Sequence, residues 1–269
     1  MTTPQLSVQL YSVNSPLAED LNGTLGRLAD IGFRNVEAFD FVRRADELGQ
    51  SFAAHGLSAP TGHAILIEQD AATPDGILTA PTADETFQAA VALGIETVID
   101  PYVGPAGWAS AGAVERTAMR LNERARQAAQ YGLRVGYHNH DHELTSLVDG
   151  TPALELFATY LDPSVVLEVD LYWATAGGHD AAALLGRLGD RVQAVHVKDG
   201  PMHGHISTAR MPTNQVPAGQ GDVPIEAALR AGRNIRYAVV EFDSYDGDIF
   251  DGIAESHMYL TGLVDDARL

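Results

Sequence analysis

Carboxylate and imidazole side chains recur in this sequence just after short apolar runs. Four such runs end in YHNHDHE (137–143), EVD (168–170), HVKD (196–199) and EFD (241–243). Burying so many polar groups costs too much free energy unless they pair with one another or bind a cation. Mixed oxygen and imidazole donors suit Mn²⁺, Co²⁺, Zn²⁺, Fe²⁺ or Mg²⁺, of which we favour Mn²⁺. The residues therefore predict a divalent-metal site.

The alternation of side chains along a strand narrows the choice of ligands. Successive strand residues point to opposite faces, so residues two apart share a face. The residues that then point the same way from four strand ends, and are the predicted metal ligands, are His138, Asp170, His196 and Glu241. At the first of these positions, parity alone supports His138, and His140 and Glu143 are alternatives.

Proton transfer next to a carbonyl is the chemistry expected of such a site. A divalent ion that chelates a hydroxy-ketone stabilises an enediolate as a Lewis acid. A neighbouring base removes the proton and returns it. The candidate bases are Glu143, Glu241 and His140. Lys198 shares a face with His196 and is predicted to neutralise an oxyanion or a substrate phosphate.

Other residues are predicted to complete the pocket. A salt bridge to Asp199 or Glu168 is the alternative role for Lys198. The residues interpreted as substrate contacts, because they end earlier strands or follow Asp170, are Glu37, His63, Asp100 and Trp173.

The elements that must position these residues alternate regularly along the chain. The predicted strands are Leu6–Tyr11, Asn35–Phe39, Ser58–His63, Thr97–Asp100, Arg134–His138, Val165–Asp170, Ala194–Lys198 and Ala238–Phe242. Segments with helical periodicity separate them. The predicted C-terminal ends of four of these helices are Gly32, Gly56, Gly94 and Gly132.

Eight strand–helix units predict a parallel sheet closed into a single (β/α)8 TIM barrel over residues 1–269. An open doubly wound sheet is the alternative. No GxGxxG follows the first strand, so a dinucleotide-binding site has no support. Segments 65–82 and 200–224 are longer than simple connections and follow strands. In a barrel they would cover the C-terminal face, where active sites lie.

Composition excludes several classes of function. The 269 residues carry a formal net charge of −19, which repels nucleic-acid phosphates. The absence of cysteine excludes disulfides and thiolate chemistry. The N-terminus lacks the pattern of a signal peptide, and no stretch approaches the roughly 18 apolar residues of a membrane helix. We expect a cytoplasmic enzyme that acts on a small molecule, as a monomer or a homo-oligomer.

Several blocks of the sequence resemble the sugar phosphate isomerase/epimerase branch of the xylose isomerase-like superfamily. These blocks are VGYHNHDHEL, LEVDLYWATAGG, VQAVHVKDG and VVEFD, in family order. The resemblance implies a metal held by Glu, Asp, His and Glu, of which the last three match Asp170, His196 and Glu241. His138 stands where ketose 3-epimerases carry the first Glu, which is a departure from the pattern.

The resemblance implies a metal-dependent isomerase or epimerase of a sugar, keto-sugar or related polyol. A lyase or dehydratase of a keto-inositol or 3-keto-glycoside is the alternative, because it shares the proton abstraction. A suitably placed acid for the leaving group would separate the two, and His140 or His142 is a candidate. A non-catalytic sugar-binding barrel is a third hypothesis.

Overall fold

The computed structural model describes residues 3–68, 70–73, 76–204, 206–209 and 212–265. Parallel strands close a barrel in the order β1-β12-β11-β10-β7-β6-β3-β2. These strands are β1 Gln5–Gln9, β2 Asn35–Ala38, β3 Ser58–His63, β6 Thr97–Asp100, β7 Arg134–His138, β10 Val166–Asp170, β11 Val192–Val197 and β12 Tyr237–Val240. The predicted (β/α)8 barrel is confirmed, and the open-sheet alternative is wrong because β1 pairs with both β2 and β12.

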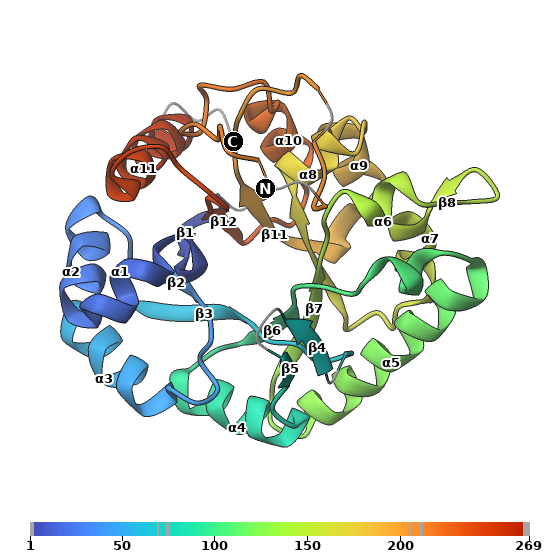
Figure 1. Cartoon of the computed structure of the whole chain (residues 1–269), viewed down its shortest axis with the longest axis horizontal. Helices are drawn as coiled ribbons and strands as arrows, with labels where there is room; N and C mark the ends of the chain where they lie inside the picture. The colour runs from blue at the N-terminus through green and yellow to red at the C-terminus, as the bar shows by residue number, and fades with distance from the viewer. Residues whose placement is uncertain (1–2, 69, 74–75, 205, 210–211, 266–269) are drawn as a thin grey trace.

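Helices form a ring outside the strands, and the chain runs once around it from blue to red (Figure 1). The α-helices are α1 Asn14–Glu19, α2 Leu21–Ile31, α3 Ala45–His55, α4 Ala83–Leu93, α5 Ala111–Ala129, α6 His142–Thr145, α7 Ala153–Tyr160, α8 Leu171–Ala176, α9 Ala181–Leu188, α10 Ile225–Ala231 and α11 Ile249–Asp265. The short 3₁₀ helices are η1 Leu10–Val13, η2 Pro105–Trp108 and η3 Gly189–Arg191. No helix in the described ranges is both long enough and apolar enough to span a membrane.

Three of the four helix ends predicted from glycines are correct. Helices α2, α3 and α4 end immediately before Gly32, Gly56 and Gly94. Helix α5 instead ends at Ala129, before the predicted Gly132. After α5 the chain forms a tightened turn, in which the backbone N–H groups of residues 130–132 donate to carbonyls three residues earlier. Gly132 supplies the positive φ of 76° that ends this turn.

Strand register sets the depth of each polar residue in the barrel. Glu168 on β10 lies opposite His138 on β7, and Asp170, two residues further on, lies opposite His196 on β11. The intervening Val169 faces outward into the main hydrophobic core beneath the helices. The alternation predicted for these strands is therefore present, with polar residues inside and valines outside.

A second, smaller apolar cluster fills the barrel interior. It consists of Ala194, Tyr237 and Val239, all buried. Ala194 precedes His196 by two residues, and Val239 precedes Glu241 by two, so each shares an inward face with a polar residue. The polar layer therefore rests on a packed apolar cluster.

The two long segments follow β3 and β11, as predicted. Segment 65–82 contains an antiparallel hairpin, β4 Asp70–Thr73 and β5 Gly76–Thr79. A second short hairpin, β8 Leu147–Val148 with β9 Thr151–Pro152, follows β7. The hairpin β4–β5 lies inside the ring of helices in Figure 1.

Segment 200–224 is fastened to the end of β11 by Asp199. The Asp199 carboxylate accepts hydrogen bonds from the backbone N–H groups of Gly200, Gly219, Gly221 and Val223, at 2.8–3.0 Å. The backbone of Gly221 passes so close that a Cβ there would lie 2.2 Å from Asp199 Oδ1. Only glycine allows this approach.

Candidate metal centre and active site

A cavity of about 550 Å³ opens at the carboxyl ends of the strands. Its polar residues are Asp40, Arg43, His63, His138, His140, Lys198, Glu241 and Asp243. The rest of its lining is largely apolar and comprises Tyr11, Phe39, Phe41, Val42, Ala64, Ile65, Ala80, Pro81, Pro101 and Tyr102. The cavity is in the size range of a small-molecule site.

The four predicted metal ligands meet at this end of the barrel. His138 and Asp170 are the last residues of β7 and β10, His196 lies in β11, and Glu241 follows β12 directly. One donor atom from each lies within 4.8 Å of all the others, and all four residues are buried. The structure therefore brings together the set that strand parity selected.

The donor atoms suit a divalent cation. Burial, reinforced by the positive charge of His196, holds the pKa of His138 well below its usual value, so its imidazole keeps a lone pair for a metal. Asp170 Oδ2 accepts no hydrogen bond within the described residues. Two imidazoles and two carboxylates form a mixed donor set typical of Mn²⁺, Fe²⁺, Co²⁺ or Zn²⁺. His138, Asp170, His196 and Glu241 thus fit a metal.

Asp170 is held in place by one side chain and one backbone group. Its own N–H donates to Asn139 Oδ1 at 3.1 Å, and its Oδ1 accepts from the N–H of Trp173 at 2.8 Å. Burial raises the pKa of Asp170 to about 6, although the Lys198 ammonium opposes this shift. Oδ1 is occupied as the N-cap of α8, so Oδ2, which forms an ion pair with Lys198, is the oxygen that would bind a cation.

Lys198 makes ion pairs with three carboxylates. Its Nζ lies 3.1 Å from Asp170, 2.7 Å from Glu241 and 3.1 Å from Asp243. Burial alone would lower the pKa of Lys198, but Asp170, Asp243 and Glu241 together raise it well above its usual value. The partners proposed from the sequence as an alternative, Asp199 and Glu168, are wrong: Asp199 fastens segment 200–224, and Glu168 binds histidines.

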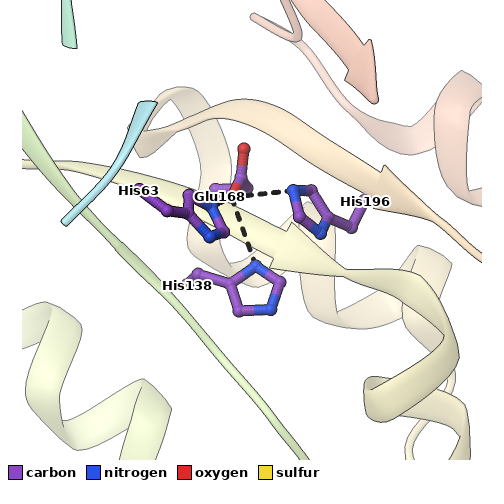
Figure 2. A group of neighbouring side chains, drawn as sticks. All are labelled: His63, His138, Glu168 and His196. Carbon is purple, nitrogen blue, oxygen red and sulfur yellow. Dashed lines mark hydrogen bonds and ion pairs between the residues drawn. The ribbon is translucent and has the colours of Figure 1, made fainter. Parts of the chain in front are cut away.

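A second group lies one layer deeper and is centred on Glu168 (Figure 2). Glu168 Oε2 is 2.7 Å from His63 Nε2, 3.2 Å from His138 Nδ1 and 3.1 Å from His196 Nε2. Glu37 Oε1 lies below, 3.0 Å from His63 Nε2 and 2.7 Å from His196 Nε2. These four donor atoms on His63, His138, Glu168 and His196 are also close enough together to hold a metal.

The carboxylates of this deeper group determine its charge. Burial alone would lower the pKa of His63, but Glu37 and Glu168 raise it to about 10. Burial likewise opposes ionisation of His196, whereas Glu168, Glu241 and Glu37 raise its pKa well above the usual value. The pKa of Glu37 is held well below its usual value by His63 and His196, against the effect of burial.

The three candidate bases have different surroundings. His140 lines the cavity, and its Nδ1 has no hydrogen-bond partner in the described part of the chain. Glu143 does not line the cavity; its carboxylate accepts from the Tyr137 hydroxyl at 2.6 Å and from the N–H of His140 at 2.9 Å. Glu241 Oε2 contacts His196 Nδ1 at 2.5 Å as well as Lys198.

Three of the four predicted substrate contacts are not part of the cavity lining. Asp100 accepts backbone hydrogen bonds from Leu66 and Ile67 through Oδ2 and from Tyr102 through Oδ1, so it shapes the loops beside the cavity. Trp173 is fully buried, with Lys198 Nζ 5.8 Å from the centre of its ring. His63 does line the cavity, whereas Glu37 lies beneath it.

Some contributors to the site were not singled out from the sequence. Asp243 binds Lys198 through both oxygens at 3.1 Å. The sequence indicates Asp243 only through the strand face that it shares with Glu241. Asn139, which holds Asp170, lies within the HNHDH run. The aromatic lining residues Phe39 and Tyr102 lie one residue after β2 and two residues after β6, but nothing in their local pattern distinguishes them from core residues.

Comparisons with known proteins agree with this architecture. A crystal structure of a sugar phosphate isomerase/epimerase from Parabacteroides distasonis ATCC 8503 is similar, with a TM-score of 0.79 and 18% identity over 96% of this chain and 98% of that one. A D-allulose 3-epimerase from Methylomonas sp. gives 0.70 and 15% over 100% and 99%. The probable 3-DHS dehydratase of Bacillus anthracis gives 0.70 and 14% over 96% and 98%.

At these identities the structural similarities show the fold alone. No curated protein matches the sequence of this chain. The family model described as xylose isomerase-like TIM barrel matches residues 25–260. This match covers most of the chain, and the chain therefore belongs to the xylose isomerase-like TIM barrel family.

Proposed function

We propose that this chain is a divalent-metal-dependent isomerase or epimerase of a sugar, keto-sugar or related polyol. The observation that carries the proposal is the meeting of His138, Asp170, His196 and Glu241 within 4.8 Å beside a cavity at the barrel mouth. Isomerases and epimerases are among the proteins of similar structure. The same complete ligand set argues against a non-catalytic sugar-binding barrel.

His138, Asp170, His196 and Glu241 would hold the metal, for which we favour Mn²⁺. The bound ion would act as a Lewis acid and make the proton next to a substrate carbonyl more acidic. In the proposal, His140 removes this proton and returns it. Burial and the nearby Lys198 charge hold the pKa of His140 well below its usual value, so its imidazole is unprotonated at neutral pH and able to accept a proton.

In the proposal, the Lys198 ammonium stabilises the negative charge that develops on the substrate oxygen. Its ammonium lines the cavity, and its ion pairs with Asp170, Glu241 and Asp243 fix its position. A substrate phosphate would have to displace one of these carboxylates. The proposal therefore favours an unphosphorylated substrate.

A second candidate function is a lyase acting on a 3-keto-glycoside. The apolar part of the cavity, which includes Phe39, Phe41, Pro101 and Tyr102, favours it because an apolar leaving group would fit there. The initial proton abstraction is the same as in the isomerase. The dehydratase among the similar structures belongs to this reaction class by its name.

Isotope exchange tests the proposal and separates the two reactions. The purified protein would be analysed for bound metal and incubated in D₂O with ketoses, keto-inositols and 3-keto-glycosides. Deuterium incorporation without elimination supports the isomerase or epimerase, and an unsaturated or dehydrated product supports the lyase.

Variants test the metal site separately. Asp170→Ala and Glu241→Ala should abolish metal retention, whereas Glu115→Ala, on the exposed face of α5, should not. Unchanged metal content in both site variants would show that the proposed ligands are wrong.

A further inference from the structure

We infer that Glu168 is a positioning residue of the metal centre, because one of its oxygens orients the ring of the ligand His138. The inference rests on the metal site proposed above. Glu168 does not line the cavity, so it would act on the metal through His138.

The two histidines contact Glu168 through different ring nitrogens. His138 faces Glu168 Oε2 with Nδ1 at 3.2 Å, and its Nε2 points towards Asp170 Oδ2 at 3.8 Å. His196 faces the same oxygen with Nε2 at 3.1 Å, and its Nδ1 points to Glu241 at 2.5 Å. Figure 2 shows one nitrogen of each ring towards Glu168. The other nitrogen of each ring lies towards a predicted carboxylate ligand, Asp170 or Glu241.

This arrangement selects one tautomer for the His138 ring. A carboxylate oxygen only accepts hydrogen bonds, so the nitrogen that faces it carries the hydrogen. A neutral imidazole has a single N–H, which leaves the lone pair on the opposite nitrogen. The Glu168 oxygen thus directs the lone pair of His138 Nε2 towards the metal centre. In the metal-free protein both nitrogens of His196 face carboxylates, Nε2 that of Glu37 and Nδ1 that of Glu241, so Glu168 does not set its tautomer. Carboxylate partners of this kind raise ligand basicity and fix ring orientation.

Other buried residues hold Glu168 in position. His63 Nε2 donates to Glu168 Oε2 at 2.7 Å and also contacts Glu37 Oε1 at 3.0 Å. His196 Nε2 lies between the same two carboxylates, 2.7 Å from Glu37. The rings of His63 and His196 stack at 5.2 Å with an angle of 7°. Two carboxylate oxygens and two imidazole nitrogens therefore alternate in a closed ring beneath the metal centre.

A metal bound in the deeper group would be a different arrangement, since Glu168 would then be a ligand. The two possible metal positions share His138 and His196 but require opposite nitrogens of each ring. A neutral His138 ring has one lone pair and cannot serve both. The upper position has two of its ligands, His138 and Glu241, in the cavity lining, whereas Glu168 and His196 are not exposed there. We therefore place the ion at the upper position, next to the cavity, with Glu168 on the side of the ligands that faces away from the cavity.

The experiment measures metal affinity and histidine tautomers, which do not depend on the unknown substrate. Mn²⁺ titration would compare wild type with Glu168→Leu, which removes the accepting oxygen, and Glu168→Gln, which keeps one. We expect a loss of about 10–100-fold in affinity for the Leu variant and a smaller loss for the Gln variant. Glu143→Gln is the matched control, because Glu143 is buried but contacts neither His138 nor His196.

Imidazole ¹⁵N NMR of the metal-free proteins gives a second measurement, for any variant that retains a wild-type circular dichroism spectrum. In wild type and Glu168→Gln, His138 should carry its hydrogen on Nδ1, and Glu168→Leu should lose this preference. Wild-type affinity and tautomers in Glu168→Leu would overturn the inference while the proposed function stands.

Two other outcomes also contradict the inference. Loss of Mn²⁺ in the Glu168 variants but not in Asp170→Asn would place the ion in the deeper group. Absence of divalent-metal binding by the wild type would overturn both the inference and the proposed function.

Discussion

Replacing Asp199 with asparagine should release segment 200–224 from the barrel while leaving the metal ligands intact. The Asp199 carboxylate accepts four backbone hydrogen bonds from both ends of that segment. An asparagine amide has only one acceptor oxygen, and its NH₂ group would face the remaining donors. About two of the four bonds should therefore be lost.

The magnitude follows from these two bonds. Hydrogen bonds to a charged acceptor contribute about 1.5–3 kcal/mol each. If the loss of both bonds destabilised the whole folded protein, the free energy of unfolding would fall by about 3–6 kcal/mol. Local opening of the segment limits this cost. We therefore expect a smaller global change together with a large local one.

Hydrogen exchange and urea unfolding would measure the two effects. The amides of Gly219, Gly221 and Val223 should exchange faster in Asp199→Asn, and Mn²⁺ affinity should stay within a few-fold of wild type. Asp190→Asn, an exposed change in η3, is the control. Unchanged protection of these amides, combined with lost metal or lost proton exchange, would refute the reasoning and place Asp199 in the chemistry.

Three further predictions concern the site itself. His140→Gln should slow solvent deuterium exchange into substrate by about 10²–10⁴-fold, whereas Glu143→Gln should change it little; the reverse order would assign the base to Glu143. Asp170, whose pKa lies at about 6, should bind metal best above that pH and lose it as protonation rises below pH 6, which Mn²⁺ titration across pH 5–8 would detect. Asp100→Asn should lower the free energy of unfolding by about 1–3 kcal/mol through one lost backbone hydrogen bond; an increased KM without lost stability would indicate substrate contact instead.

Strand ends and strand parity could be predicted because they depend on local pattern. The alternation of valines with His138, Asp170 and His196 identified both the strands and their inward faces. Five of the predicted strands match the structure at one end or both, and β3, β6 and β7 match at both ends. The first strand ends earlier than predicted, because Leu10 and Tyr11 enter η1.

Other features depend on contacts between residues far apart in the sequence. His63 and Glu168 are separated by 105 positions, so no local pattern indicated that they meet. Glu143 was a reasonable candidate base from its place in the HNHDHE run, yet the Tyr137 hydroxyl and the turn into α6 direct it away from the cavity. The partners of Lys198 likewise depend on how β10, β11 and β12 adjoin one another.

The register of β10 has a consequence for how the chain finds its fold. A slip of one residue would turn Glu168 and Asp170 outward into the apolar layer under the helices and bring Val169 inward. Both carboxylates would then be buried without partners, at a cost of several kcal/mol. The residues proposed for catalysis thus also destabilise a barrel in which β10 has a shifted register. A metal ion bound by His138, Asp170, His196 and Glu241 would stabilise the one register in which all four residues meet.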